Sequence, residues 1–265
     1  MRILTDYLFI VAGVGVLLSI LLIWQIVSIT NVLPSTIFPS AYSVVLSFFS
    51  QVENGSVILA VIYTLSRLFE GYLFAAAIGI VAGISIGLNR LVNRSLDPLV
   101  QFLRPMPSVV LIPLAILYFG LVDSVIILIV TYASLWPILI NTIDGVRSID
   151  PLVIETANQL RITGLKRLRK IILPAAAPFI VSGLRVSLGI AWIVAVTAEM
   201  IGGIVSNGVG VSIFYYLNSG NLAPMYGAII AVAIFAYFLN RILLVTQYRL
   251  MPWVARSSRM LDHEA

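Results

Sequence analysis

The sequence predicts an all-α, polytopic membrane protein with six transmembrane helices. Of the 265 residues, 60% are hydrophobic and only 10% are charged, whereas soluble proteins carry about a quarter charged residues. The apolar residues gather in runs long enough to cross a hydrocarbon core of roughly 30 Å. The net charge of +5 is confined to the connections between these runs, so it indicates topology rather than a nucleic-acid partner.

The six spans are expected to form one membrane domain that covers residues 1–265. The first span, Leu8–Ile29, holds 22 residues without a charge and is not followed by a cleavage site, so we expect a retained helix. The other spans are expected at about residues 68–88, 96–119, 124–143, 177–201 and 225–245. A loop at 202–224, which contains the aromatic residues Phe214, Tyr215 and Tyr216, should join the last two.

Small residues should set how the second span packs. Gly79, Gly83 and Gly87 recur four residues apart, a spacing that lets helices approach closely within lipid. Before this span, apolar residues at helical spacing predict a helix at about 40–53. This helix lies either in the periplasmic membrane interface or against the protein's own spans.

The third span is expected to be broken. Arg104, Pro105 and Pro107 interrupt its apolar run, and Pro113 follows. Prolines free backbone carbonyls, which is tolerated inside a membrane only where protein or a water-filled cavity satisfies them. Arg104 is therefore a candidate to line a translocation pathway.

The positive residues orient the spans. The connections 30–56, 120–123 and 203–224 hold no Lys or Arg. The N-terminus, the 89–94 loop, the 144–174 loop and the C-terminal tail hold Arg2, Arg90, Arg94, Arg147, Arg161, Lys166, Arg167, Arg169, Lys170, Arg249, Arg256 and Arg259. Because positive residues stay on the cytoplasmic side, we expect both termini and the 144–174 loop to be cytoplasmic.

The 144–174 loop is the one long polar insertion in the chain. Asp150 followed by Pro151 predicts the start of a short helix with a polar outer face. Thr163 and Gly164 should break it, and a second short helix should run to Leu173 and end at Pro174. Polar helices between two apolar spans must lie outside the bilayer, where they indicate a docking surface.

Several chemistries are not expected in this chain. It has no cysteine, and its single histidine is His263, so neither a thiol nucleophile nor a histidine metal cluster is predicted. No glycine-rich phosphate loop ending in Lys-Ser or Lys-Thr is present. We therefore expect a protein that is not an enzyme, binds no cofactor or metal, and draws its energy from elsewhere.

The 144–174 loop resembles the cytoplasmic signature of the permease subunits of binding-protein-dependent ABC importers. That signature is Glu-Ala-Ala, then Gly four residues on, then Ile-x-Leu-Pro, and it is matched here by Glu155, Thr156, Ala157, Ile171, Leu173 and Pro174. Arg161 stands at the glycine position and Gly164 comes three residues later, which predicts a shifted turn. The runs RPMPSVVLIPLAILYFG, PILINTIDGVRSIDP and SGLRVSLGIAWIVAVTAEMIGG are similar to the nitrate, sulfonate, taurine and bicarbonate branch of this family.

The resemblance implies the type I importer permease fold in a bacterial inner membrane. Two permease copies, expected to be identical, would form the pathway. ATP and magnesium would bind separate ATPase subunits, and a periplasmic or lipid-anchored binding protein would deliver a small anion. The coupling contact with the ATPase is assigned by resemblance to Glu155, Thr156, Ala157, Asn158, Leu160, Arg161 and Gly164.

Two intramembrane charges in the fifth span are further candidates for the pathway. Arg185 lies eleven residues beyond Pro174, about 16 Å along a helix, and forms either a structural ion pair or part of an anion pathway. Glu199 lies near the outer end, where it can hydrogen-bond the following glycine-rich loop. Arg67 and Glu70, three residues apart in the second span, are expected to pair with each other.

Two alternatives stay open on the sequence alone. A permease for a riboflavin-like solute or a pyrimidine precursor would look much the same. Half of a secondary transporter driven by an ion gradient could also contain a broken helix, although no internal repeat is evident. The energy source of transport separates this second alternative from an ABC importer.

Overall fold

The computed structural model describes residues 2–30, 34, 37–201 and 205–250, which contain helices and turns but no strand. The rest of the basic C-terminal tail and positions 202–204 of the predicted loop lie outside the described residues. The helices, with η for non-α helical turns, are α1 (Arg2–Ile29), α2 (Ala41–Glu53), α3 (Ser56–Leu88), α4 (Arg90–Leu103), η1 (Ser108–Leu111), α5 (Ile112–Phe119), α6 (Asp123–Arg147), α7 (Pro151–Gln159), α8 (Gly164–Arg167), η2 (Leu168–Ile172), α9 (Leu173–Glu199), α10 (Val209–Asn218) and α11 (Leu222–Leu250).

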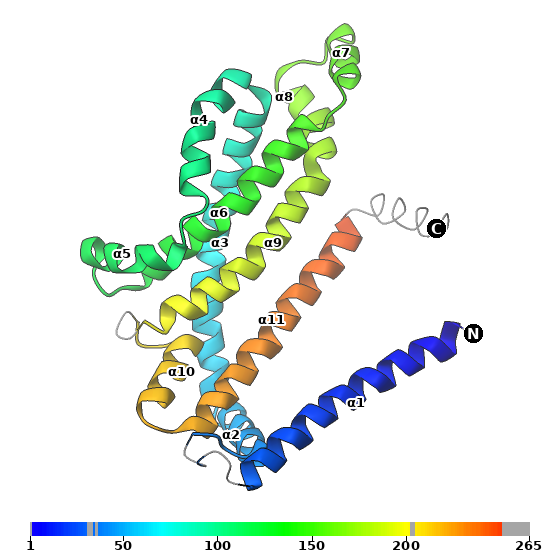
Figure 1. Cartoon of the computed structure of the whole chain (residues 1–265). Coiled ribbons are helices and arrows are strands. Elements are labelled where there is room, and N and C mark those ends of the chain that lie inside the picture. The colour runs from blue at the N-terminus through cyan, green and yellow to red at the C-terminus, as the bar shows by residue number, and fades with distance from the viewer. Residues whose placement is uncertain (1, 31–33, 35–36, 202–204, 251–265) are drawn as a thin grey trace.

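Three long helices, α3, α6 and α9, form the centre of the molecule (Figure 1). Helix α6 packs against both of the others along its length. Its Ile126 and Ile129 are fully buried with Leu68 of α3 and Ala191 of α9 in the main apolar cluster. The short helices α7 and α8 lie at one end of this core, and α2 and α10 lie at the other (Figure 1).

The glycine spacing in the second span has the packing role predicted from the sequence. A Cβ atom on Gly83 would lie 2.6 Å from Cβ of Thr142, and one on Gly87 would lie 2.8 Å from Cβ of Val146. A Cβ on Gly79 would lie 3.0 Å from Ile138. These glycines therefore let α3 and α6 approach more closely than side chains would allow.

Among the described residues, four helices are long and apolar enough to cross a membrane, or five if the bent pair of α4 with η1 and α5 counts as one span. The four are α3, α6, the continuous helix Gly164–Glu199, and α11. Helix α1 covers the predicted first span, and its described apolar stretch is Leu18–Ile29. The all-α membrane fold is thus established, with the second span beginning at Ser56, earlier than predicted.

The predicted break in the third span is present. Its two halves meet at an angle of 84° around Arg104 and the neighbouring prolines. The carbonyl oxygen of Leu103, at the end of α4, accepts a hydrogen bond from the Tyr132 hydroxyl at 2.6 Å. It also accepts one from the backbone N–H of Met106 at 3.2 Å. Tyr132 on α6 therefore satisfies a carbonyl that the break exposes.

Two predictions in the polar and outer connections were wrong. Pro174 does not end a helix, because a π-helical turn at Leu168–Ile172 leads directly into α9. Pro174 stands in the first turn of α9, where the widened π turn accommodates its missing N–H. The aromatic residues at 214–216 belong to helix α10 rather than to a loop, with Val209 and Ile213 buried against the core.

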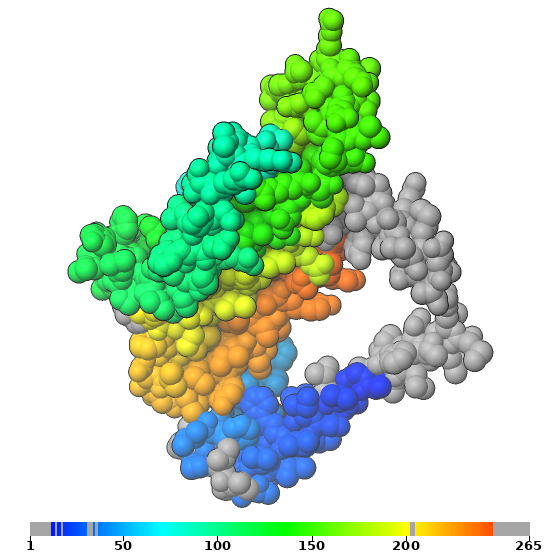
Figure 2. All heavy atoms as spheres, turned by 45° about the horizontal axis from the view of Figure 1, so that its top comes forward, coloured from blue at the N-terminus to red at the C-terminus, as the bar shows by residue number. Residues whose placement is uncertain are grey.

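Helix α1 stands away from the core over much of its length (Figure 2). It is held at its C-terminal end, where Trp24 donates a hydrogen bond to the Pro39 carbonyl at 3.0 Å. The Trp24 ring also contacts Phe38 and, on α11, Tyr226, with ring centroids 5.6 Å apart in each pair. The apolar side chains of Leu18, Ile20, Leu21, Leu22, Ile23, Ile26 and Ile29 are exposed on this single chain.

Candidate functional site

The predicted docking loop forms a compact element at the end of the molecule (Figures 1 and 2). As the sequence predicts, α7 begins at Pro151, and the Asp150 carboxylate accepts a hydrogen bond from the Leu152 N–H at 2.8 Å. The Arg167 guanidinium donates a hydrogen bond to the Asn158 side chain at 3.0 Å, which ties α8 to α7. Local capping therefore fixes the start of α7 and a side-chain contact fixes its end.

The turn after α7 lies where the signature places its glycine. Arg161 has a φ of 55°, in the left-handed region that favours glycine. The backbone N–H of Ile162 closes the turn on the Ala157 carbonyl at 2.8 Å. Gly164 has a φ of 57° and begins α8. The shifted turn predicted from Arg161 is therefore not found, since Arg161 itself adopts a left-handed conformation of the kind that glycine favours.

The loop presents both polar and apolar side chains to its surroundings. Glu155, Thr156 and Asn158 are exposed, whereas Ala157 is only 2% exposed and faces inward. Leu152 and Leu160 are 65% and 68% exposed, although they lie in the most polar part of the chain. Exposed apolar side chains in a loop outside the spans are typical of an interaction surface.

The base of the loop is anchored in the core. Ile172 is 2% exposed and packs with Val146 of α6 and Ala176 of α9 in a second apolar cluster. The signature residues Ile171 and Leu173 are half-buried on either side of it, and Leu173 packs against this cluster. The loop is consequently joined to α6 and α9 by packing as well as by the chain.

A buried polar network occupies the opposite end of the core. The Glu199 carboxylate is 2.7 Å from the Arg67 guanidinium and accepts a hydrogen bond from the Thr64 hydroxyl at 2.7 Å. It also accepts one from the backbone N–H of Gly210 at 3.1 Å, which confirms the predicted contact with the following glycine-rich segment, although Gly210 lies in the first turn of α10 rather than in a loop. Arg67 further contacts Asp123 at 3.2 Å and donates to the Asn207 carbonyl.

The expected Arg67–Glu70 pair is therefore wrong. Arg67 faces inward and is 3% exposed, whereas Glu70 is exposed and forms no ion pair with it. The i to i+3 spacing is compatible with a pair on the same helix. The side chain of Arg67 is instead buried between Asp123 of α6 and Glu199 of α9, which neutralise its charge. Thr64 was not singled out from the sequence, and its position one turn before Arg67 is the signal that could have identified it.

The three candidate pathway residues lie in different surroundings. Glu199 is 1% exposed and is committed to the buried network. Arg185 lines a cavity of about 250 Å³ between α9 and α11 with Asn240 and Trp192. Both ion pairs of the described residues belong to Arg67, so the structural ion pair considered for Arg185 is not formed there. Arg104 lies at the break after α4 and lines two adjoining cavities.

A third cavity adjoins the docking loop. It has a volume of about 710 Å³ and lies between the α3–α4 junction, the end of α6 and α7. Arg90, Arg94 and Arg147 line it together with Glu155. Residues that the positive-charge pattern places on one side of the membrane thus gather around the start of α7.

The chain is similar to known transport permeases. Residues 75–255 match the model of the family described as "Binding-protein-dependent transport system inner membrane component". The chain is 32% identical over 234 residues to SsuC of Bacillus subtilis, described as an aliphatic sulfonates transport permease (88% of this chain, 84% of that protein). It is 33% identical over 250 residues to the bicarbonate transport system permease protein CmpB of Synechococcus elongatus (91% and 88%). It is 35% identical over 191 residues to the nitrate import permease protein NrtB of Leptolyngbya laminosa (71% and 67%).

A solved structure shares the fold. A chain of the MetNI methionine ABC transporter, in an inward-facing conformation, superposes with a TM-score of 0.61 and 20% sequence identity. The match covers 71% of this chain and 94% of that chain.

The chain belongs to the family of inner membrane components of binding-protein-dependent transport systems. It is therefore the membrane permease subunit of a transport system rather than an enzyme. Permeases of this family work with ATPase subunits and substrate-binding proteins.

Proposed function

We propose that this permease belongs to an ATP-driven importer for a small oxyanion and works as a pair of identical copies in the bacterial inner membrane. Helix α7 would dock on an ATPase subunit, which binds ATP and magnesium, while this chain binds no cofactor. A periplasmic or lipid-anchored binding protein would deliver the solute at the end formed by α2 and α10. The observation that carries the proposal is the structure of the α7 loop.

Three features of this loop support a coupling role. Its polar outer face and the exposed Leu152 and Leu160 offer a mixed surface of the kind that protein interfaces use. Its ends are fixed by the Asp150 cap and the Arg167–Asn158 hydrogen bond. Its base is packed on α6 and α9 through Ile172, so a force applied to α7 reaches two core helices. The exposed residues Glu155, Thr156, Asn158 and Leu160 would make the contact, while Ala157, Arg161 and Gly164 shape the turn.

The proposed orientation places α7 in the cytoplasm. Arg90, Arg94 and Arg147 surround the start of α7, and Lys166, Arg169 and Lys170 follow it. Neither α2 nor α10, at the opposite end, contains a Lys or Arg. The positive-inside rule therefore supports a cytoplasmic α7 and cytoplasmic termini.

The exposed surface of α1 supports the pairing of two copies. Its apolar side chains face away from the core of their own chain, and those of Ile23, Ile26 and Ile29 are 61%, 58% and 66% exposed. A second copy would cover part of this surface and complete a pathway between the two cores. Lipid would cover the rest.

The substrate class is supported by the names of three relatives. They are described as permeases for aliphatic sulfonates, bicarbonate and nitrate, each of which carries a compact oxyanion group.

Reconstitution tests the proposal. The permease would be co-purified with its ATPase and inserted into lipid vesicles. The cognate binding protein and labelled nitrate, bicarbonate or taurine would be added on the side of the membrane that the ends of α2 and α10 face. We expect uptake of one of these solutes that requires ATP and survives an ionophore. Uptake that needs no ATP and collapses with the ionophore would indicate a secondary transporter instead. Preferred uptake of riboflavin or a pyrimidine would refute the anion assignment alone.

A further inference from the structure

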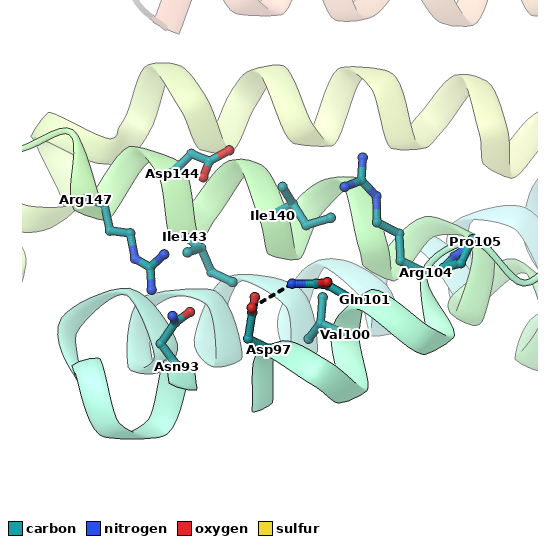
Figure 3. A pocket seen from close by; sticks show the side chains of 10 residues that line it. All are labelled: Asn93, Asp97, Val100, Gln101, Arg104, Pro105, Ile140, Ile143, Asp144 and Arg147. Carbon is teal, nitrogen blue, oxygen red and sulfur yellow. Dashed lines mark hydrogen bonds between the residues drawn. The ribbon is translucent and has the colours of Figure 1, made fainter. Parts of the chain in front are cut away.

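One face of α4 is polar although the helix forms half of a broken span. Asn93, Asp97, Gln101 and Arg104 follow one another at intervals of four, four and three residues, so they share a face. All four line a cavity of about 620 Å³ between α4 and α6. Figure 3 shows them facing α6, with Gln101 hydrogen-bonded to Asp97 at 2.7 Å. Polar groups at membrane depth are tolerated where they line an aqueous cavity.

This cavity adjoins a second one deeper in the molecule. The second has a volume of about 440 Å³, and Arg104 and Ile140 line both. Helix α6 contributes Tyr132, Trp136 and Asn141 to the second cavity, and α9 contributes Val186 and Ile190. The two cavities therefore meet at Arg104, the first extending toward the α7 end of the molecule and the second toward the core, and together they outline a candidate route.

The charge along this route changes at Arg104. The first cavity holds two acids, Asp97 and Asp144, and two arginines, Arg104 and Arg147. Among the described residues that line the second cavity, Arg104 carries the only charge. Since both ion pairs of the described residues belong to Arg67, Arg104 has no carboxylate partner there. An unpaired guanidinium is an unneutralised positive charge, because arginine stays protonated at any physiological pH.

A second hydrogen-bond donor in this region also lacks a partner. The indole N–H of Trp136 is shielded from solvent and has no acceptor among the described residues. Trp136 lies beside Tyr132, with ring centroids 5.5 Å apart, and both line the second cavity. Tyr132 donates its hydroxyl hydrogen to the Leu103 carbonyl, next to Arg104, so the break that carries Arg104 is held against α6. The backbone that carries Arg104 is thus held against α6, while the charge of its side chain has no carboxylate partner among the described residues.

We infer that the groove between α4 and α6 is part of the translocation pathway and that Arg104 holds a compact oxyanion as it passes. The guanidinium presents parallel N–H donors that match two oxygens of a nitrate, bicarbonate or sulfonate group. It also disfavours cations at the point where no acid lines the route. This inference rests on the proposed function, and it assigns the substrate contact to a residue of the permease.

Uptake kinetics in the reconstituted importer test this role. Arg104→Gln removes the charge, so we expect uptake to fall by roughly tenfold or more, the loss expected for a hydrogen bond to a charged group. Arg104→Lys keeps the charge but loses the planar guanidinium, so its uptake should lie between that of the unaltered importer and that of Arg104→Gln. Stimulation of ATP hydrolysis by the loaded binding protein should persist in both variants. Arg241→Gln on α11, an exposed arginine that lines neither cavity, should transport normally.

Cysteine labelling gives a readout that does not depend on transport. The chain has no cysteine, so Asn141→Cys places a single thiol in the second cavity. An anionic methanethiosulfonate should label it faster than a cationic one, and Arg104→Gln should abolish this preference. Normal uptake by Arg104→Gln, or no labelling of Asn141→Cys by either reagent, would overturn the inference. If the unaltered importer shows no ATP-dependent uptake, the proposed function fails instead.

Discussion

The guanidinium of Arg67 on α3 and the carboxylate of Glu199 on α9 lie 2.7 Å apart, and their side chains are 4% and 0% exposed. This ion pair joins two of the three core helices at the end opposite α7. Thr64 and the Gly210 N–H complete the hydrogen bonds of the carboxylate. Because a buried charge without its partner is costly, removal of either Arg67 or Glu199 alone is expected to destabilise the fold.

Removal of Glu199 tests this pair. We expect Glu199→Ala to lower the free energy of unfolding by about 3–5 kcal/mol, because Arg67 then stays buried without its closest partner. Thermal unfolding of the detergent-purified permease measures the change. Replacing both residues, Arg67→Met with Glu199→Met, should recover part of the loss. Glu70→Ala, exposed on the same helix as Arg67, should have no effect, and an equal loss there would contradict the assignment.

A charge reversal on α7 tests the coupling surface. Glu155 is exposed, so Glu155→Lys should leave the amount of permease in the membrane unchanged. Uptake should be abolished, because the ATPase surface that accepts the negative charge of Glu155 would then face the positive charge of a lysine. The matched control is Glu53→Lys, which reverses an exposed acid at the end of α2. Normal transport by Glu155→Lys would remove the coupling role from this residue.

The close approach of α3 and α6 predicts a strong effect of one methyl group. In Gly83→Ala the new Cβ would lie 2.6 Å from Cβ of Thr142, so the two helices must separate. Overpacking of this kind costs about 1–3 kcal/mol, which a lower unfolding temperature would report. Gly189→Ala on α9 is the control, since its Cβ would meet nothing within 4 Å. Similar melting of the two variants would show that the contact is easily relieved.

The backbone of Arg161 predicts that one substitution stabilises the protein. A side chain in the left-handed region costs roughly 1–2 kcal/mol, so Arg161→Gly should raise the unfolding temperature or leave it unchanged. Arg169→Gly, within the helical turn Leu168–Ile172, should instead lower it, because glycine costs about 1 kcal/mol inside a helix. If both variants were destabilised equally, Arg161 would not be strained.

Much of the fold could be predicted because apolar length and proline position act locally. The spans, the break near Arg104, the start of α7 at Pro151 and the glycine contacts of α3 all follow from such signals. Helix α10 was missed because it is too short to span a membrane and is flanked by Gly, Asn and Ser. The spacing of Val209 and Ile213, four residues apart and both buried, was the available signal.

The candidate sites were less predictable where they depend on tertiary contacts. Sequence spacing suggested a partner for Arg67 on its own helix, but the partner comes from α9, more than a hundred positions away in the chain. A proline at position 174 normally ends a helix, and only the π turn before it explains its tolerance. The adjoining cavities at Arg104 arise from the packing of α4, α6 and α9, which no single stretch encodes.

The continuity of the helix from Gly164 to Glu199 has a mechanical consequence. Its 36 residues make a helix about 54 Å long, with the docking loop at one end and the Arg67–Glu199 ion pair at the other. If the ATPase tilted this helix about its contact with α6, the docking-loop end and the Arg67 end would move in opposite directions. Opening of the permease at one end and its closing at the other would then be parts of a single movement.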